Sequence, residues 1–137
     1  MSIFVDTSMW YAAVDSSDAG NKRATSILTA DEPLVTSDHV LIETWTLIRN
    51  RIGKHAADRF WGKMRGGIAM IESIGPADME NAWQIGTTFS DQDFSIVDRT
   101  SFAVMQRLGI ERVASLDEDF AIFRFGPGRR RAFTILR

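Results

Sequence analysis

Short runs of β-branched and aromatic residues alternate with helical patterns along the whole of this 137-residue chain. The first run, Ile3-Phe4-Val5, leads straight into Asp6-Thr7-Ser8, whose side chains are of the types that cap helices. Pro33 introduces a second run, and Ser37 or Asp38 suits the cap of the helix that follows. Strands that alternate with helices in this way predict a three-layer α/β/α sandwich around a mostly parallel sheet of about five short strands.

The remaining boundaries follow from glycines, prolines and apolar patterns. We expect strands at residues 3–5, 34–36, 68–72, 112–116 and 132–136. We expect helices after the first strand, in the segment that ends near residue 30, and at residues 38–52, 54–64, 76–89 and 96–108. A single domain over residues 1–137 suits this length, since domains typically take roughly 100 to 200 residues.

The composition excludes several kinds of site. The absence of cysteine excludes disulfides, thiol catalysis and thiolate-bound zinc. With only His39 and His55, a metal site must use carboxylates, which favour Mg²⁺ or Mn²⁺. The formal charge of −2 does not indicate a generally basic nucleic-acid-binding protein. No apolar run approaches the ~20 residues of a membrane span, and the N-terminus does not resemble a signal peptide, so we expect a cytoplasmic protein with no membrane partner.

Four acidic residues are predicted to meet at one edge of the sheet. Asp6 follows the first strand and Asp117 the fourth, and ligands of such sheets bind beyond the carboxyl ends of the strands. Glu43 shares a helix face with apolar residues. Asp98 stands at the start of a helix, on the stripe that Phe102 continues inward. The pattern therefore places all four carboxylates around one candidate site.

Each acid also has a structural explanation that the sequence leaves open. Asp6 suits a helix cap, Asp98 suits the positive end of a helix, Glu43 suits a solvated helix face, and Asp117 suits an acidic turn. If they do converge, two carboxylates ~5 Å apart repel each other by roughly 3 kcal/mol at an effective dielectric constant near 20. A divalent cation removes that cost, and the natural substrate of such a cluster is a phosphodiester.

Four segments, in this order, resemble the PIN domain ribonucleases, and within them the VapC toxins of bacterial type II toxin–antitoxin pairs. They are Phe4-Val5-Asp6-Thr7-Ser8, residues 41–47 around Glu43, residues 93–105 around Asp98, and Ser115-Leu116-Asp117-Glu118-Asp119-Phe120. The resemblance implies a PIN-like fold and a Mg²⁺-dependent or Mn²⁺-dependent endoribonuclease that cuts RNA by in-line hydrolysis.

Residue by residue, the resemblance implies that Asp6, Glu43, Asp98 and Asp117 hold the metal. Ser8 and Ser115 match positions that hydrogen-bond those carboxylates. Asp119 is an alternative to Asp117 as the fourth acid, and Asp93 either assists the site or is a plain loop residue; these are the remaining candidates.

The resemblance also implies partners. These are an RNA substrate such as tRNA or rRNA, a cognate antitoxin protein and a second copy of the chain. The arginines at positions 124 and 129–131 suit phosphate contacts or a solvated face. The helix that carries Glu43 is apolar nearly all round, with Leu41, Trp45, Ile48 and Ile52 on its other side, so we expect a protein surface to cover part of it.

Other families with this architecture fit less well. A receiver domain needs paired acids after the first strand, and a dehalogenase-type phosphatase needs an aspartate at position 8, where Ser8 stands. Dinucleotide and P-loop sites need glycine signatures that are missing. The alternative that remains is a non-catalytic PIN-like module that binds RNA or protein.

Overall fold

The protein is built around a five-stranded sheet in which every pair of neighbouring strands is parallel, in the order β3-β2-β1-β4-β5. The computed structural model describes all residues 1–137. The strands are β1 (Ile3–Val5), β2 (Leu34–Ser37), β3 (Met70–Glu72), β4 (Arg112–Ala114) and β5 (Thr134–Leu136). The prediction of a mostly parallel sheet of about five short strands is confirmed.

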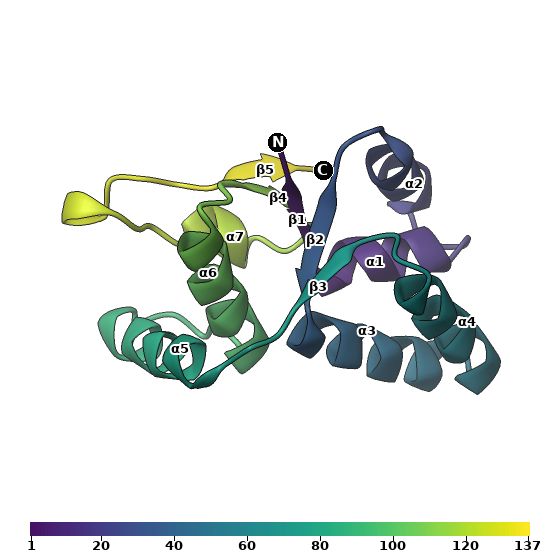
Figure 1. The fold of residues 1–137 in the computed structure, drawn as a ribbon, viewed down its shortest axis with the longest axis horizontal. Helices are drawn as coiled ribbons and strands as arrows, with labels where there is room; N and C mark the ends of the chain where they lie inside the picture. Colours follow the sequence, from purple (N-terminus) through teal and green to yellow (C-terminus); the bar gives the residue numbers. More distant parts are fainter.

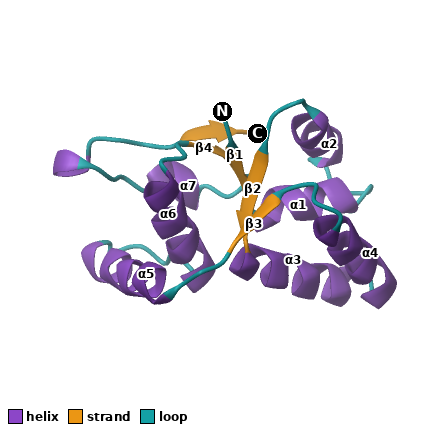
Figure 2. Ribbon diagram, viewed as in Figure 1, coloured by secondary structure: helices purple, strands orange, loops and turns teal.

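Helices cover both faces of this sheet. They are α1 (Thr7–Val14), α2 (Asn21–Thr29), α3 (Asp38–Arg51), α4 (Lys54–Arg65), α5 (Pro76–Thr88), α6 (Ile96–Leu108) and α7 (Asp119–Ile122), with a 3₁₀ turn η1 (Pro127–Arg129). In Figure 1, α1, α2 and α4 lie on one side of the sheet, and α5, α6 and α7 lie on the other. Figure 2 shows the strands between these two layers, so the predicted three-layer sandwich is confirmed. α3 runs past the end of the sheet and packs against α1, α4 and α6.

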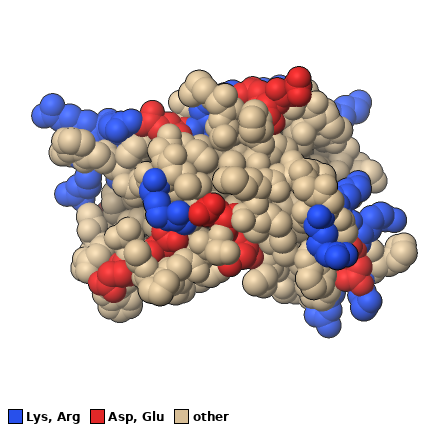
Figure 3. Space-filling model, viewed as in Figure 1, with Lys and Arg blue, Asp and Glu red and all other residues tan.

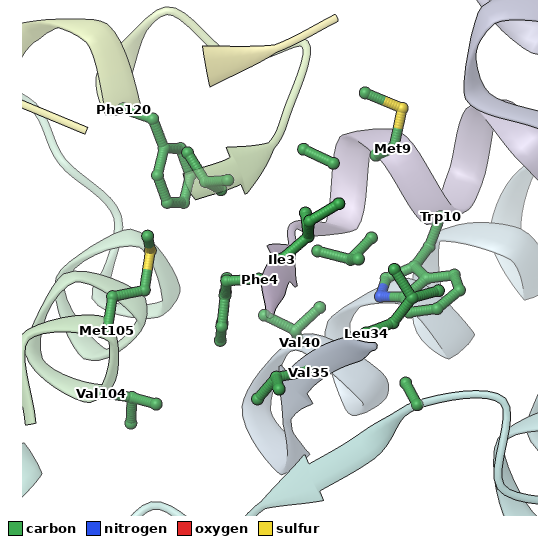
Figure 4. Packing of buried hydrophobic residues seen from close by; sticks show 14 of the residues in the cluster. Ile3, Phe4, Met9, Trp10, Leu34, Val35, Val40, Val104, Met105 and Phe120 are labelled. Carbon is green, nitrogen blue, oxygen red and sulfur yellow. The ribbon is translucent and has the colours of Figure 1, made fainter. Parts of the chain in front are cut away.

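The central strand β1 joins the two halves of the core. Its three residues are fully buried. Because successive side chains of a strand point to opposite faces, Phe4 points toward Met105 and the α6 layer, whereas Ile3 points toward Trp10 and the α1 layer (Figure 4). On the α6 side, Phe102 stacks on a second buried ring, Phe123, with the ring centroids 4.3 Å apart. The carboxyl end of β1 is thus held by packing on both faces of the sheet.

The third and fifth strands each begin two residues later than predicted, at Met70 and Thr134, and the segment after β4 also differs from the prediction. The predicted fourth strand reached Leu116, but β4 ends at Ala114. The backbone N–H of Leu116 donates to Ser8 Oγ, and that of Asp117 donates to Ser115 Oγ. Serine side chains therefore replace strand partners, and the chain turns away from the sheet. The four-residue helix α7 follows, which is too short to give a helical pattern in the sequence.

Most of the face drawn in Figure 3 is neither acidic nor basic, and the charged side chains form small separate patches on it. Basic side chains gather at the end of the molecule where η1 lies. None of the helices is both long enough and apolar enough to pass through a lipid bilayer.

Candidate metal centre and substrate cavity

A cavity of about 540 Å³ opens at the carboxyl end of β1, between α1, α3 and the start of α6. Its lining includes seven carboxylates and one cationic side chain. The lining residues are Asp6, Thr7, Ser8, Tyr11, Asp18, Glu43, Leu47, Arg51, Asp93, Ser95, Asp98, Leu116, Asp117 and Asp119. All four acids of the predicted quartet are therefore brought to one cavity, together with Ser8, Asp93 and Asp119.

Asp6 is held at the floor of this cavity by two serines. Its side chain is only 3% exposed, and Oδ2 accepts hydrogen bonds from Ser8 Oγ and Ser115 Oγ, both at 3.0 Å. Burial raises the pKa of Asp6 from 3.8 to about 6, although the serine hydrogen bonds oppose the shift. Asp6 is the N-cap residue of α1, but its side chain makes no capping hydrogen bond. A cap alone therefore does not explain this carboxylate.

Asp98 combines a structural contact with a place in the acidic cluster. Its backbone N–H donates to Ser95 Oγ, and its Oδ2 accepts from the Ser95 N–H, which forms a reciprocal cap at the start of α6. Burial is the largest cause that raises the pKa of Asp98 to about 8, followed by a hydrogen bond with Asp119 and the charges of Asp117 and Asp6. The cap fixes the position of the carboxyl group, and the neighbouring acids make its ionisation costly.

Asp117 and Asp119 both face Asp98. One carboxylate oxygen from each of these three residues lies within 4.8 Å of the others. The Ser115 hydroxyl orients this loop through the Asp117 N–H, and the Asp119 N–H donates to Asp117 Oδ1 at 2.9 Å. The sequence offered Asp117 and Asp119 as alternatives, but the early end of β4 brings both into the cluster.

Glu43 reaches the cavity from α3. Its Oε1 accepts a hydrogen bond from Thr7 Oγ1 at 2.6 Å, and its side chain is half-buried. Glu43 is thus not the solvated helix residue that the sequence left open. It stands outside the set of three carboxylates that lie within 4.8 Å of one another.

Sequence reasoning missed four residues that line the cavity or support the acids. Thr7 orients Glu43, and no local pattern predicts that contact between α1 and α3. Asp18 comes from the loop after α1, where no motif marks it. Tyr11 and Arg51 form the cavity wall. Arg51 lies eight residues after Glu43, so the helical repeat of α3 could have identified it.

The donor set fits a hard divalent cation. Three carboxylates cluster within 4.8 Å, and two of the acids around the cavity have pKa values well above their usual range because they are buried near like charges. Repulsion between such carboxylates destabilises the fold in the absence of a cation, and a doubly positive ion removes that repulsion. Oxygen ligands of this kind suit Mg²⁺ and Mn²⁺.

Residues 3–126 match the PIN domain family. The chain belongs to this family. It is 37% identical over 124 residues to the 23S rRNA-specific endonuclease VapC20 of Mycobacterium tuberculosis, with 90% of this chain and 95% of that protein covered. It is also 26% identical over 137 residues to ribonuclease VapC26 of the same organism, with 98% of this chain and 99% of that protein covered. The chain is thus a VapC-type PIN domain, and its relatives are ribonucleases.

Solved structures agree with this assignment. The crystal structure of M. tuberculosis VapC20, described as a toxin that cleaves the sarcin–ricin loop, matches with a TM-score of 0.83 and 36% identity, over 88% of this chain and 93% of that one. A toxin–antitoxin complex from Klebsiella pneumoniae matches in fold, with a TM-score of 0.66 and 18% identity, over 87% of this chain and 90% of that one. The PIN-like fold is therefore confirmed.

Proposed function

We propose that this VapC-type ribonuclease is a Mg²⁺-dependent or Mn²⁺-dependent endoribonuclease that cuts 23S rRNA, as the toxin of a toxin–antitoxin pair. The observation that carries the proposal is the cluster of Asp98, Asp117 and Asp119 in a cavity lined by further acids. The 37% identity to a 23S rRNA-specific endonuclease supports rRNA over tRNA as the substrate.

In this proposal the carboxylates are metal ligands. Asp98, Asp117 and Asp119 would hold the cation, with Asp6 and Glu43 as the further carboxylates of the same cavity. When bound, the cation neutralises charge on the phosphate and lowers the pKa of the attacking water. The protein side chains supply the orientation: two serines hold the buried carboxylate at the floor, and Thr7 holds Glu43.

The apolar surface of α3 and α4 supports a protein partner. Leu41, Ile42, Trp45 and Trp61 line an apolar cavity of about 200 Å³, and the side chains of Ile42 and Trp61 are 62% and 48% exposed. Exposed apolar groups of this size are costly unless another protein covers them. An antitoxin and a second copy of this chain are the occupants we propose for the exposed apolar faces, in keeping with the toxin–antitoxin complexes that share the fold.

The decisive experiment incubates the purified protein with 23S rRNA, and separately with tRNA, and maps the cleaved ends. We expect cleavage of 23S rRNA at one position when Mg²⁺ or Mn²⁺ is present, and none in EDTA. Asp98→Asn is expected to abolish cleavage while the circular dichroism spectrum stays unchanged. Binding without cleavage in either metal would instead favour a non-catalytic PIN-like module, and cleavage of tRNA alone would refute the rRNA assignment.

A further inference from the structure

The acidic cavity has one cationic lining residue, Arg51. Arg51 is the last residue of α3, eight positions after Glu43, and Leu47 between them lines the same cavity. This spacing places the three side chains on one helix face, spread over about 12 Å along the axis. Arg51 therefore lines the cavity from the C-terminal end of α3, and it lies outside the cluster of Asp98, Asp117 and Asp119.

An aromatic ring holds the guanidinium group of Arg51 in place. Cζ of Arg51 lies 5.1 Å from the centroid of the Tyr11 ring, in a cation–π contact. The ring is itself fixed, since Tyr11 is buried and its hydroxyl donates to Asp15 Oδ2 at 2.6 Å. The other oxygen of Asp15 accepts two hydrogen bonds from Ser17. The Tyr11 ring that Arg51 contacts is therefore held in place from α1.

Arg51 forms no direct ion pair with a carboxylate, although, besides the hydrogen bonds from Ser17, its charge helps to lower the pKa of Asp15. Arg51 takes part in none of the six ion pairs of the protein, although seven carboxylates line the same cavity. A guanidinium has five N–H donors in a planar fork that matches two oxygens of a phosphate, so its contact with Tyr11 leaves donors for an anion. Arg51 thus has the chemistry of an anion site beside a cavity that otherwise repels anions.

We propose that Arg51 binds an RNA phosphate that flanks the scissile bond. The inference rests on the proposed ribonuclease function of this cavity. A metal ion offsets the repulsion between the carboxylates and the scissile phosphate, but it leaves the neighbouring phosphates facing an acidic rim. Arg51 supplies the missing positive charge at that rim, on the side of the cavity formed by α1 and α3. It therefore sets the direction in which the RNA strand crosses the site.

The test compares Arg51→Met with Arg49→Met in the intact protein, using an RNA that the wild-type protein cleaves. Arg49 is the matched control, because it stacks on Trp45 on the same helix but does not line the cavity. We expect Arg51→Met to raise KM about 10- to 100-fold, as for a lost charge-assisted hydrogen bond, with a smaller change in kcat. The slope of log affinity against log salt should fall by about 0.7, the value for one phosphate of a single strand.

Further measurements separate the possible outcomes. The increase in melting temperature caused by Mg²⁺ should be the same in Arg51→Met as in the wild type, since the metal ligands are untouched. Arg51→Lys should recover the salt slope but not the whole of KM, because lysine lacks the planar fork. Equal KM and salt slope in Arg51→Met and Arg49→Met would overturn the inference. Absence of cleavage by the wild-type protein would refute the proposed function instead, so the two failures are distinguishable.

Discussion

Replacing Asp6 with asparagine is expected to stabilise the metal-free protein at pH 7.5. Asp6 is 3% exposed, and burial raises its pKa from 3.8 to about 6. A carboxyl group whose pKa is higher in the folded state binds its proton more tightly there than in the unfolded chain. As pH rises from about 4 to about 6, the folded state therefore loses stability, and above pH 6 the full cost is present.

The size of the effect follows from that shift. A change of about two pKa units corresponds to about 3 kcal/mol, at roughly 1.4 kcal/mol per unit. Asparagine keeps an oxygen that accepts from Ser8 and Ser115, but it loses the charge that strengthens those bonds, which costs about 1 kcal/mol. No capping bond is lost, because the Asp6 side chain makes none. The net gain is about 2 kcal/mol, or roughly 7 °C in melting temperature for a chain of this length.

The assay is thermal unfolding in EDTA at pH 4 and pH 7.5, with Asp91→Asn as the control for an exposed carboxylate. We expect Asp6→Asn to melt higher than the wild type at pH 7.5, and the difference to disappear at pH 4. Added Mg²⁺ should raise the melting temperature of the wild type more than that of the variant, since the variant lacks one carboxylate of the site. A variant that is less stable than the wild type at pH 7.5 without metal would refute the reasoning.

Three further predictions concern the acidic site and the ion pair between Arg107 and Asp78. Mg²⁺ affinity should increase as pH rises from 6 to 8, because the pKa of Asp98 is about 8 and its proton must leave before a cation binds; calorimetry that shows no pH dependence would contradict this. Ser115→Ala removes the hydroxyl that donates to Asp6 and accepts from the Asp117 N–H, so calorimetry should show Mg²⁺ binding that is about 10-fold weaker. Unchanged Mg²⁺ affinity would show that Ser115 does not position the carboxylates. Arg107→Met leaves Asp78, whose side chain is 4% exposed, without its bidentate partner, so urea denaturation should show that the free energy of unfolding falls by about 2 kcal/mol. A fall of less than about 0.5 kcal/mol, the range of an ordinary surface substitution, would contradict this prediction.

The parts of the fold that the sequence predicted are those with local causes. Asp6 was placed because it directly follows a buried strand, and Glu43 because it shares a helix face with apolar residues. Asp98 was placed by its position at a helix start, and its reciprocal cap with Ser95 is a local contact over three residues. Each of these positions depends on a backbone that the neighbouring residues determine, so pattern and spacing were sufficient.

Local sequence patterns did not predict the contacts between segments that are far apart in the sequence. The choice between Asp117 and Asp119 depended on where β4 ends, and that end is set by Ser8, which lies 108 residues before Leu116 in the sequence. The hydrogen bond from Thr7 to Glu43 likewise joins residues that are 36 positions apart. Helix periodicity could have identified Arg51, but its importance depends on Tyr11, which belongs to another helix.

The buried carboxylates of this PIN domain lower the stability of the metal-free protein. The serines lower the pKa of Asp6 while burial raises it, and burial has the larger effect. For Asp98 the hydrogen bond with Asp119 and the charges of Asp6, Asp117 and Asp119 all add to the effect of burial. The fold therefore carries ionisable groups that oppose its own stability at neutral pH, and the packed strands and the phenylalanine cluster around Phe102 offset that cost. Cation binding relieves the same repulsion, so metal affinity and the instability of the metal-free protein have one physical origin, and a substitution that removes one should diminish the other.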